Sequence, residues 1–401
     1  MCCFRVATQP TLFWRACIPG GVARPRSIAN LLNKPNACYS AKSRDILIKH
    51  FINIVKMSSS KLNPRESGAY IVEHAKHVRI LPAGIEKLTQ EIVEALIEKR
   101  IAVENFSQHE LHPNPDSKQP EEYSKAADWV FVLDTLNFCF WTPDNYTKYK
   151  VDGYTGYFAL CAAVKRAIKE GVDVITPKFY SKIDLKTLEN IFRSDDGETV
   201  IPLLQKRLES LHEVGKVLID KYGGSFENVI KKAEKSAVCL LNLIVEEFPC
   251  FRDEAEFAGK RVSILKRAQI LVGDVWSCYR GQGLGYFNDI DQITMFADYR
   301  IPQVLVHFGS LEYTSELMEF LKTDTILENG DPREVEIRGA SIHIIEQVRD
   351  AVVKILKEQH PEISLDNVNS IVIDQYLWDY RRRHNADLEH IPFHKVLSIY
   401  Y

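Results

Sequence analysis

One short stretch of the chain combines acidic, aromatic and cationic side chains. Residues 287–308 read FNDIDQITMFADYRIPQVLVHF and contain three aspartates, Asp289, Asp291 and Asp298. Pro302 is typical of the first turn of a helix, because the amides there have no partner within the helix. Asp298 is therefore predicted just ahead of a helix start, where the helix dipole favours an ionised carboxylate. Such a carboxylate could stabilise a developing positive charge, although a capping aspartate between two core helices would look the same.

Three further clusters place polar groups where the hydrophobic pattern predicts buried positions. They are Asp134, Asn137, Phe138 and Trp141; His109 with Glu110 in a proline-bounded loop; and Asp374 to Tyr380. Carboxylates beside large aromatic rings suit a flat, polar or cationic heterocycle, which stacks on the rings and donates to the carboxylates. Three cations that flank the central stretch could hold a phosphate: Lys266, Arg267 and Arg300. Each cluster taken alone fits a structural role better than a functional one.

The elements that position these residues are predicted to be mostly α-helical. Asn63 opens a capped first helix, because Pro64 and Glu66 complete a capping box. Further helices are predicted over 85–100, 156–170, 175–260, 260–280, 311–358 and 368–383, with a charged turn at 330–340. A small antiparallel sheet is predicted where residues 137–141 alternate in polarity and pair with 148–154 through an Asp152-Gly153 turn.

The composition is that of an ordinary globular protein, with a formal net charge of −3 over 401 residues. That charge does not suit a protein whose main partner is polymeric nucleic acid, where affinity comes largely from cationic contacts to phosphates. No apolar run approaches the ~20 residues of a membrane span. Residues 57–401 are predicted to form one continuous domain.

Residues 1–56 differ from the rest, because they are rich in Lys and Arg and contain Asp45 as their one acidic residue. This composition is typical of a mitochondrial transit peptide. An upstream extension of the reading frame that never folds is an equally good interpretation. We therefore expect a cytoplasmic protein, or a mitochondrial one if residues 1–56 act as a transit peptide.

Several long motifs, in their order along the chain, resemble those of the queuosine salvage protein family. They are LNPRES (62–67), DWVFVLDTLNFCFW (128–141), YTGYFALCAAVKRA (154–167), KRVSILKRAQILVGDVWS (260–277), DQITMFADYR (291–300), REVEIRG (333–339) and DQYLWDYRR (374–382). The resemblance covers residues 60–401 and leaves out 1–56. It implies a helical fold similar to that of DNA glycosylases, and a queuosine 5′-phosphate N-glycosylase/hydrolase that needs no metal or organic cofactor. The implied reaction releases queuine from queuosine 5′-monophosphate.

Cleavage of a glycosidic bond builds positive charge on the sugar, so an ionised carboxylate at the anomeric carbon either stabilises that charge or attacks. The resemblance implies Asp298 in this role, with Asp289 as the runner-up. The leaving base is a 7-deazaguanine and has no N7 to protonate. Its departure must therefore be assisted at another atom of the base, or by hydrogen bonds that stabilise the anion.

The resemblance also implies substrate contacts on several elements. Asp374 and Asp379 are expected to recognise the base, and His109 to contact the base or its cationic side group. The remaining expected contacts are stacking by Phe296, Phe138 and Trp141, polar contacts from Asn137, Gln375 and Arg300, and phosphate binding by Lys266 or Arg267. In the family's form of its last motif a tyrosine follows the first aspartate, where this chain has Gln375. Any role of that tyrosine would here be taken by an amide or be absent.

Two interpretations of other classes stay open from the sequence. One is a nucleic-acid glycosylase or tRNA-binding module, and the other is a non-catalytic queuosine-binding protein. We expect a monomer that acts on a small molecule, without a stable nucleic-acid partner and without a membrane.

Overall fold

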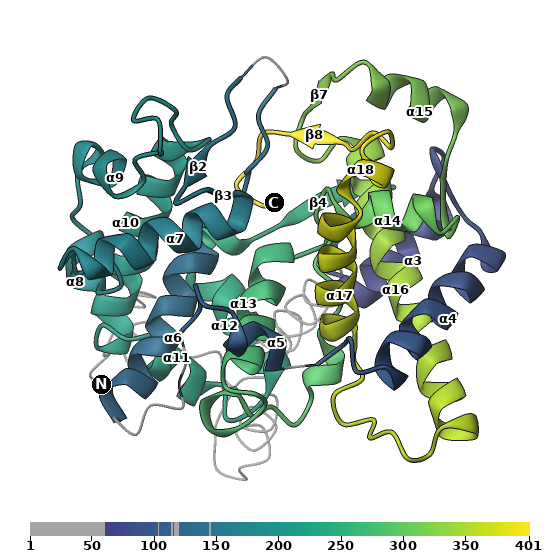
Figure 1. The fold of residues 1–401 in the computed structure, drawn as a ribbon, viewed down its shortest axis with the longest axis horizontal. Helices are drawn as coiled ribbons and strands as arrows, with labels where there is room; N and C mark the ends of the chain where they lie inside the picture. The colour runs from purple at the N-terminus through teal and green to yellow at the C-terminus, as the bar shows by residue number, and fades with distance from the viewer. Residues whose placement is uncertain (1–60, 103, 114, 116–119, 144–145) are drawn as a thin grey trace, which may run out of the picture. The chain divides into compact units, whose positions relative to one another are not determined.

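The computed structural model describes residues 61–102, 104–113, 115, 120–143 and 146–401 (Figure 1). Every described element belongs to one compact unit, Ser60–Tyr401, which we call the second unit because residues 1–59 precede it. The predicted targeting segment, residues 1–56, lies outside the described residues. Among the residues that are described, no helix has both the length and the apolar character needed to cross a membrane.

Helices dominate the described chain, which confirms the predicted mostly α-helical fold. The α-helices are α3 (Pro64–His74), α4 (Pro82–Ile97), α5 (Glu104–Gln108), α6 (Pro120–Thr135), α7 (Gly156–Lys169), α8 (Pro177–Tyr180), α9 (Leu185–Ile191), α10 (Leu204–Tyr222), α11 (Glu227–Lys232), α12 (Ala237–Glu247), α13 (Lys266–Cys278), α14 (Ile301–His307), α15 (Ser315–Lys322), α16 (Pro332–Gln359), α17 (Ser370–Arg383) and α18 (Asn385–Leu388). Three short 3₁₀ turns, η1 (Pro249–Phe251), η2 (Gly283–Gly285) and η3 (Ile290–Gln292), join some of them.

The strands are short and form four separate pairs among the described residues. Three pairs are antiparallel: β1 (Val78–Ile80) with β6 (Leu311–Tyr313), β2 (Lys150–Val151) with β3 (Tyr154–Thr155), and β4 (Glu254–Phe257) with β5 (Lys260–Ser263). The fourth pair, β7 (Ile326–Leu327) with β8 (Lys395–Val396), is parallel. None of these pairs forms a layer of the fold. Each pair joins neighbouring helices and loops locally.

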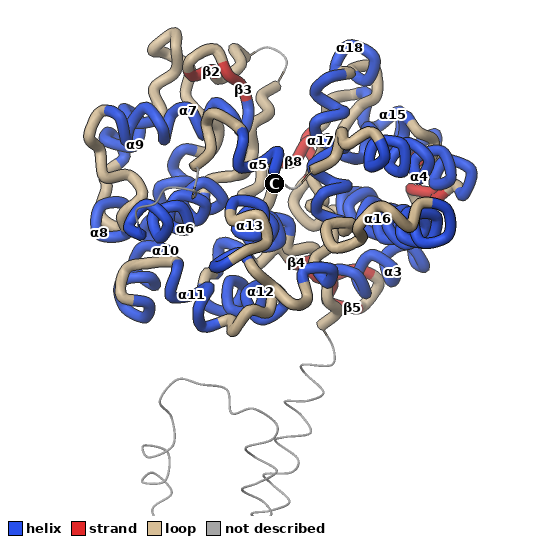
Figure 2. The backbone as a smooth tube through the Cα atoms, turned by 60° about the horizontal axis from the view of Figure 1, so that its bottom comes forward, coloured by secondary structure: helices blue, strands red, loops and turns tan. Residues whose placement is uncertain are grey.

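The helices of the second unit pack around two large hydrophobic clusters. Figure 2 shows the two corresponding groups of helices as two halves. The first cluster draws mainly on α6, α7 and α10 to α13, and the second on α4 and α14 to α17. Helix α17 contributes to both, with Ile371 and Val372 in the first cluster and Ile373 and Leu377 in the second. Helix α17 is therefore fixed against both halves of the unit.

Helix α3 begins as the sequence predicts. The Asn63 side chain accepts a hydrogen bond from the Glu66 amide at 2.9 Å, and the Glu66 carboxylate accepts from the Asn63 amide at 3.0 Å. The helix then packs closely against α16, where a Cβ on Gly339 would lie 2.5 Å from Ile71 Cδ1. A glycine at this position of α16 therefore sets the distance between the two helices.

The predicted sheet between residues 137–141 and 148–154 is wrong in its first strand. Residues 137–141 form no strand, and β2 pairs instead with β3 across the predicted turn, where Asp152 and Gly153 have φ of +51° and +78°. The carbonyls of Leu136, Phe138 and Cys139 accept hydrogen bonds from the buried Arg207 guanidinium. A side chain, not a neighbouring strand, therefore satisfies this backbone, which local alternation of residue types cannot reveal.

Two further boundaries differ from the sequence predictions. The predicted helix 260–280 begins only at Lys266, because residues 260–263 form β5. Its partner β4 lies inside the predicted helical region 175–260, which therefore ends before Glu254. The predicted charged turn at 330–340 lies almost wholly within α16. Its charges are buried as pairs: the Arg338 guanidinium bonds Glu334 at 2.9 Å and Asp253 at 2.6 Å, so a run of charged residues can occupy a core-facing helix.

Candidate active site

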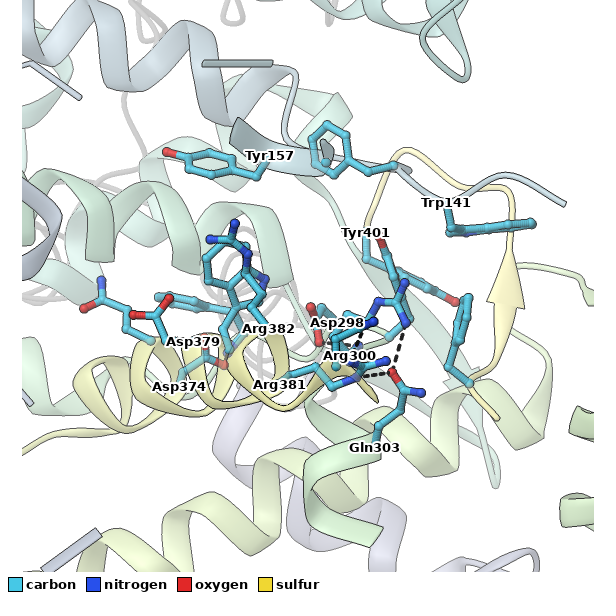
Figure 3. A pocket seen from close by; sticks show the side chains of 18 of the residues that line it. Trp141, Tyr157, Asp298, Arg300, Gln303, Asp374, Asp379, Arg381, Arg382 and Tyr401 are labelled. Carbon is cyan, nitrogen blue, oxygen red and sulfur yellow. Dashed lines mark hydrogen bonds between the residues drawn. The ribbon is translucent and has the colours of Figure 1, made fainter. Parts of the chain in front are cut away.

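A cavity of about 1280 Å³ lies between α17 and the segments around α5 and α7. Its floor comes from α13 and from residues 296–303, and residues 389–395 close one end. Ligand pockets usually enclose ~300–1,000 Å³, so this cavity has room for a nucleotide-sized molecule. Most of the predicted site residues line this cavity, and Figure 3 shows several of them.

Asp298 lies at the centre of the cavity wall. Its Oδ1 accepts hydrogen bonds from the amides of Arg300 and Ile301, each at 2.8 Å, directly ahead of α14. The structure thus confirms that Asp298 precedes a helix start with Pro302 in the first turn. Burial raises the pKa of Asp298, against the opposing effects of Lys266 and the two amides. The carboxylate is therefore a stronger base than an exposed aspartate.

Lys266, the first residue of α13, supplies a buried cation to this site. Burial lowers the pKa of Lys266 to about 8, while the negative charge of Asp298 favours the ammonium form. Two more buried carboxyls stand behind it: burial raises the pKa of Asp134 to about 7 and raises that of Asp274 well above the ordinary range. Burial favours the protonated form of both carboxyls, and of the charges around Lys266 that of Asp298 favours the ammonium form most.

Asp374 projects into the cavity from α17. One of its oxygens accepts a hydrogen bond from the Phe296 amide at 3.0 Å. Burial and the neighbouring Asp298 carboxylate raise the pKa of Asp374 well above the ordinary range. Two nearby carboxyls in unequal surroundings titrate apart, and Asp298 has more groups that favour its charge. Burial thus raises the pKa of both carboxyls, but Asp298 raises that of Asp374 further, whereas Lys266 and two amides favour the charge on Asp298.

An aromatic recess occupies the end of the cavity between α5, α7 and α17. The His109 ring stacks on Phe158, with centroids 4.1 Å apart and planes 11° apart. The Arg382 guanidinium lies 4.4 Å from the Phe158 centroid and 4.8 Å from that of Trp378. Asp379 stands exposed at the rim of the recess. A flat or cationic group could bind here between rings and carboxylates.

The opposite end of the cavity is cationic. Arg300 and Arg381 both donate to the side-chain oxygen of Gln303, at 3.1 and 2.9 Å (Figure 3). The Arg300 guanidinium also lies 4.6 Å from the Phe393 ring centroid. A carboxylate-rich wall and an arginine-rich wall therefore face the same cavity, with Asp298 between them in the view of Figure 3.

The structure brings most of the predicted site residues together. Those that line the cavity are His109, Asn137, Trp141, Lys266, Phe296, Asp298, Arg300, Asp374, Gln375 and Asp379. Positions five apart on a helix point about 140° apart. Asp374 and Asp379 nonetheless reach one cavity because it extends around α17. Gln375, the departure from the family motif, donates to Ser277 Oγ at 3.2 Å and so bridges α17 to α13.

Three of the predicted site residues, Phe138, Arg267 and Asp289, do not line the cavity. The Phe138 ring is fully buried, with the Arg207 and Arg267 guanidinium groups 4.4 and 4.9 Å from its centroid. Arg267 is also fully buried and donates to backbone carbonyls. It is therefore unable to reach a phosphate in the cavity.

Asp289 has a capping role instead of a catalytic one. Its carboxylate accepts from the Ala237 amide at 2.5 Å and from Ser236 Oγ at 2.6 Å, at the start of α12. Asp289 and Asp298 thus both accept hydrogen bonds from amides at the start of a helix, but only Asp298 does so at the cavity wall.

Sequence reasoning missed several cavity residues, chiefly Tyr157, Phe158, Asp274, Gln303 and Arg381. A signal for Arg381 was present, because residues seven apart lie on one face of a helix and Arg381 follows Asp374 by seven. Gln303 carries no such signal. Its neighbours, the carbonyls of Leu388 and Ile391, come from a distant part of the chain.

Comparison with known proteins gives a consistent result. The model of the family described as "Queuosine salvage protein" matches residues 112–401. A Mus musculus protein is 44% identical over 345 residues, which cover 85% of this chain and 99% of that protein. A Nematostella vectensis protein is 40% identical over 357 residues (86% and 100%), and a Schizosaccharomyces pombe protein is 34% identical over 359 residues (84% and 99%). Each of the three is named queuosine 5′-phosphate N-glycosylase/hydrolase.

Proposed function

The chain belongs to the queuosine salvage protein family and hydrolyses the N-glycosidic bond of queuosine 5′-monophosphate, and we propose that Asp298 is the carboxylate that drives this reaction. The single observation that carries the proposal is the position of Asp298. Asp298 is a buried carboxylate at the cavity wall that accepts hydrogen bonds from two amides. The buried ammonium group of Lys266 favours its charged form. A carboxylate so restrained needs little reorganisation when positive charge develops beside it.

The reaction requires one bond to form and one to break. Water adds its oxygen to the anomeric carbon, and the bond between that carbon and the base breaks with its electron pair going to the base. The water loses a proton and the base gains one, which gives ribose 5-phosphate and queuine. The ionised Asp298 stabilises the positive charge on the sugar and can accept the proton of the attacking water.

The departing base needs help at an atom other than N7, since carbon occupies that position in a 7-deazaguanine. Asp374 supplies it: a protonated carboxyl donates a hydrogen bond to the base as negative charge builds there. Its burial and its nearness to Asp298 raise the pKa of Asp374 and so favour this protonated form. The aromatic recess of His109, Phe158 and Trp378 then receives the flat base or its cationic side group.

The enzyme acts as a single chain on a free nucleotide, and a stable nucleic-acid complex forms no part of this proposal. One chain supplies all the cavity-lining side chains named above, and the net charge of −3 gives no general attraction for a polyanion. Free queuine released from queuosine 5′-monophosphate, but not from tRNA that carries queuosine, would support this choice of substrate. Release from intact tRNA would favour the nucleic-acid glycosylase alternative, and release from neither would favour a binding protein.

We propose that the enzyme is cytoplasmic. In the alternative, residues 1–56 act as a targeting segment and the enzyme is mitochondrial. Fusion of residues 1–56 to a fluorescent reporter decides between them, since a diffuse cytosolic signal removes the targeting hypothesis.

The test of the catalytic assignment is Asp298→Asn. The amide oxygen of asparagine can still accept from Arg300 and Ile301, so the fold should survive while the charge is lost. We expect kcat to fall about 10²- to 10³-fold, as when one pre-organised electrostatic contact is removed from an active site. Asp289→Asn is the matched control, because it makes the same change at a capping aspartate outside the cavity and should leave kcat unchanged. Retention of most of the rate by Asp298→Asn would overturn the assignment.

A further inference from the structure

One long motif of the chain, residues 333–339, contributes no side chain to the cavity. Glu334 and Arg338 of this motif are charged, yet each is only 1% exposed on α16. They lie four residues apart, so they face the same side of the helix, and the guanidinium bonds the Glu334 carboxylate at 2.9 Å. The Arg338 guanidinium also makes a bidentate pair with the buried Asp253 carboxylate, at 3.0 and 2.6 Å. We call Asp253, Glu334 and Arg338 the buried charge cluster.

Within this cluster, Asp253 fixes the start of α13. Its carbonyl accepts from the amides of Ile264 and Leu265, each at 3.0 Å, and its carboxylate accepts from the Lys266 amide at 2.9 Å. Leu265 has a φ of +55°, a left-handed conformation that is strained for a bulky side chain and persists only where its surroundings enforce it. Three hydrogen bonds to Asp253 supply that restraint. The position of Lys266 therefore depends on Asp253.

Arg338 holds the backbone beside the other charged residue of the site. Its Nε donates at 3.0 Å to the carbonyl of Ala297, the residue directly before Asp298. Its guanidinium also lies 4.2 Å from the ring centroid of Tyr401, which lines the cavity. The planar fork of an arginine can bind a carboxylate with two nitrogens and a carbonyl with the third, which an ammonium group cannot do in the same fixed geometry.

The two opposite charges of the site thus share one buried support. Asp253 bonds the backbone of Lys266, Arg338 bonds the backbone next to Asp298, and the side chains of Asp253 and Arg338 bond each other. Lys266 favours the charged form of Asp298, and the interaction of two charges depends on their separation. A buried ion pair adds little net stability compared with packed apolar residues, so its contribution here is to geometry.

We propose that the Asp253–Arg338 pair positions Lys266 relative to Asp298, and that Glu334 keeps Arg338 aligned for this task. None of the three cluster residues lines the cavity, so they are positioning residues. This inference rests on the proposed function, because it takes Asp298 as the catalytic carboxylate.

The test is Asp253→Asn, with kcat, KM and the pH dependence of kcat/KM measured on the full chain. Asparagine keeps the volume, but its NH₂ group would face either the Lys266 amide or the guanidinium, so one of these contacts is lost. We expect kcat to fall about 10- to 100-fold, as when catalytic groups are slightly misplaced, with KM changed by less than about threefold. The stoichiometry of queuine binding, measured by calorimetry, counts the folded chains to which kcat refers.

The acid limb of the pH profile distinguishes a positioning role from a purely structural one. If Lys266 moves away from Asp298, the pKa of Asp298 rises, and the midpoint of the acid limb of kcat/KM should move to higher pH by about 0.5–1 unit. Loss of the negative charge of Asp253 would by itself lower the pKa of Asp298, so it cannot produce this shift. The variant leaves in place the other charged and titratable groups around Asp298, which are Tyr299, Arg300, Asp374 and Arg381.

Glu336→Gln is the matched control. Glu336 belongs to the same motif, is 1% exposed and does not line the cavity. Its carboxylate accepts from the amides of Lys76 and His77 at 2.9 and 2.6 Å. The substitution makes the same change from acid to amide in a buried carboxylate that binds backbone amides. It should lower the stability and leave kcat and the acid midpoint unchanged.

A folded Asp253→Asn chain with the wild-type kcat, or with an acid midpoint that does not rise, would overturn the proposal. If Asp253→Asn does not fold, Arg338→Lys gives the same test with the same expectation, since lysine keeps the charge but cannot hold the Ala297 carbonyl in the same geometry. Asp298→Asn separates this inference from the proposed function. Loss of rate in Asp298→Asn with full kcat in Asp253→Asn removes only the positioning role, whereas a fully active Asp298→Asn removes the catalytic assignment and this inference with it.

Discussion

Arg267→Met should destabilise the fold strongly and leave phosphate binding intact. The guanidinium of Arg267 is fully buried and donates to the carbonyls of Asp134, Thr135 and Cys250. Methionine fills a similar volume but donates nothing, so three buried carbonyls lose this partner, at about 1–3 kcal/mol each. Removal of a buried charge that has no ion pair offsets part of this loss. We expect the free energy of unfolding to fall by about 3–5 kcal/mol, a large part of the ~5–15 kcal/mol that a domain usually has.

Urea unfolding followed by circular dichroism measures this change, with linear extrapolation to zero denaturant. Arg252→Met is the matched control. The exposed Arg252 also donates to two carbonyls, those of Val245 and Glu246, both at 2.7 Å, but water can replace it there. Its loss should cost about 1 kcal/mol or less. An Arg267→Met chain with wild-type stability and a raised KM for the nucleotide would refute this reasoning and restore Arg267 as a phosphate ligand.

Three further predictions concern the charges of the site. Burial raises the pKa of Asp298, so kcat/KM should fall at low pH with a midpoint above the usual pKa range of a carboxylate. Burial lowers the pKa of Lys266 to about 8, so kcat/KM should fall again as the pH rises through about 8. A pH–rate profile checks both limbs, and persistence of the basic limb in Lys266→Met would show that another group causes it. Asp374→Asn should lower kcat by no more than about tenfold, because a neutral amide resembles a protonated carboxyl that acts as a donor; a loss as large as that of Asp298→Asn would show that Asp374 acts in its ionised form. Asp289→Ala should lower the free energy of unfolding by about 1–2 kcal/mol, as expected for a lost helix cap, with kcat unchanged in a saturating assay; a fall in kcat without a loss of stability would contradict its capping role.

The parts of the site that the sequence predicted are those with a local cause. Asp298 could be placed because Pro302, four residues later, marks a helix start, and the capping box at Asn63 is equally local. The resemblance to a family then selected Asp298 over Asp289, which local chemistry alone could not do. Both are aspartates that bind helix-initiating amides, and only the surrounding fold shows which one faces a cavity.

The parts that were missed depend on contacts between distant segments. The alternation at residues 137–141 looks like a strand, but two buried arginines from α10 and α13 fix this segment and enclose the Phe138 ring. At the basic end of α17, Arg381 turns into the cavity because Gln303 and Asn385 bind it there. Side-chain partners of this kind leave no periodic signal in the sequence.

The contribution of α17 to both hydrophobic clusters has a consequence for hydrogen exchange. Ile371 and Val372 pack in one cluster and Ile373 and Leu377 in the other, so an opening confined to one half would leave α17 packed against the other half and would not free its amides. They should exchange at nearly the rate of global unfolding and therefore report the stability of the whole folded unit. A nucleotide bound along this helix would slow the exchange of these amides further, by a factor that depends on its concentration and its Kd. The Kd of the nucleotide could therefore be measured without turnover.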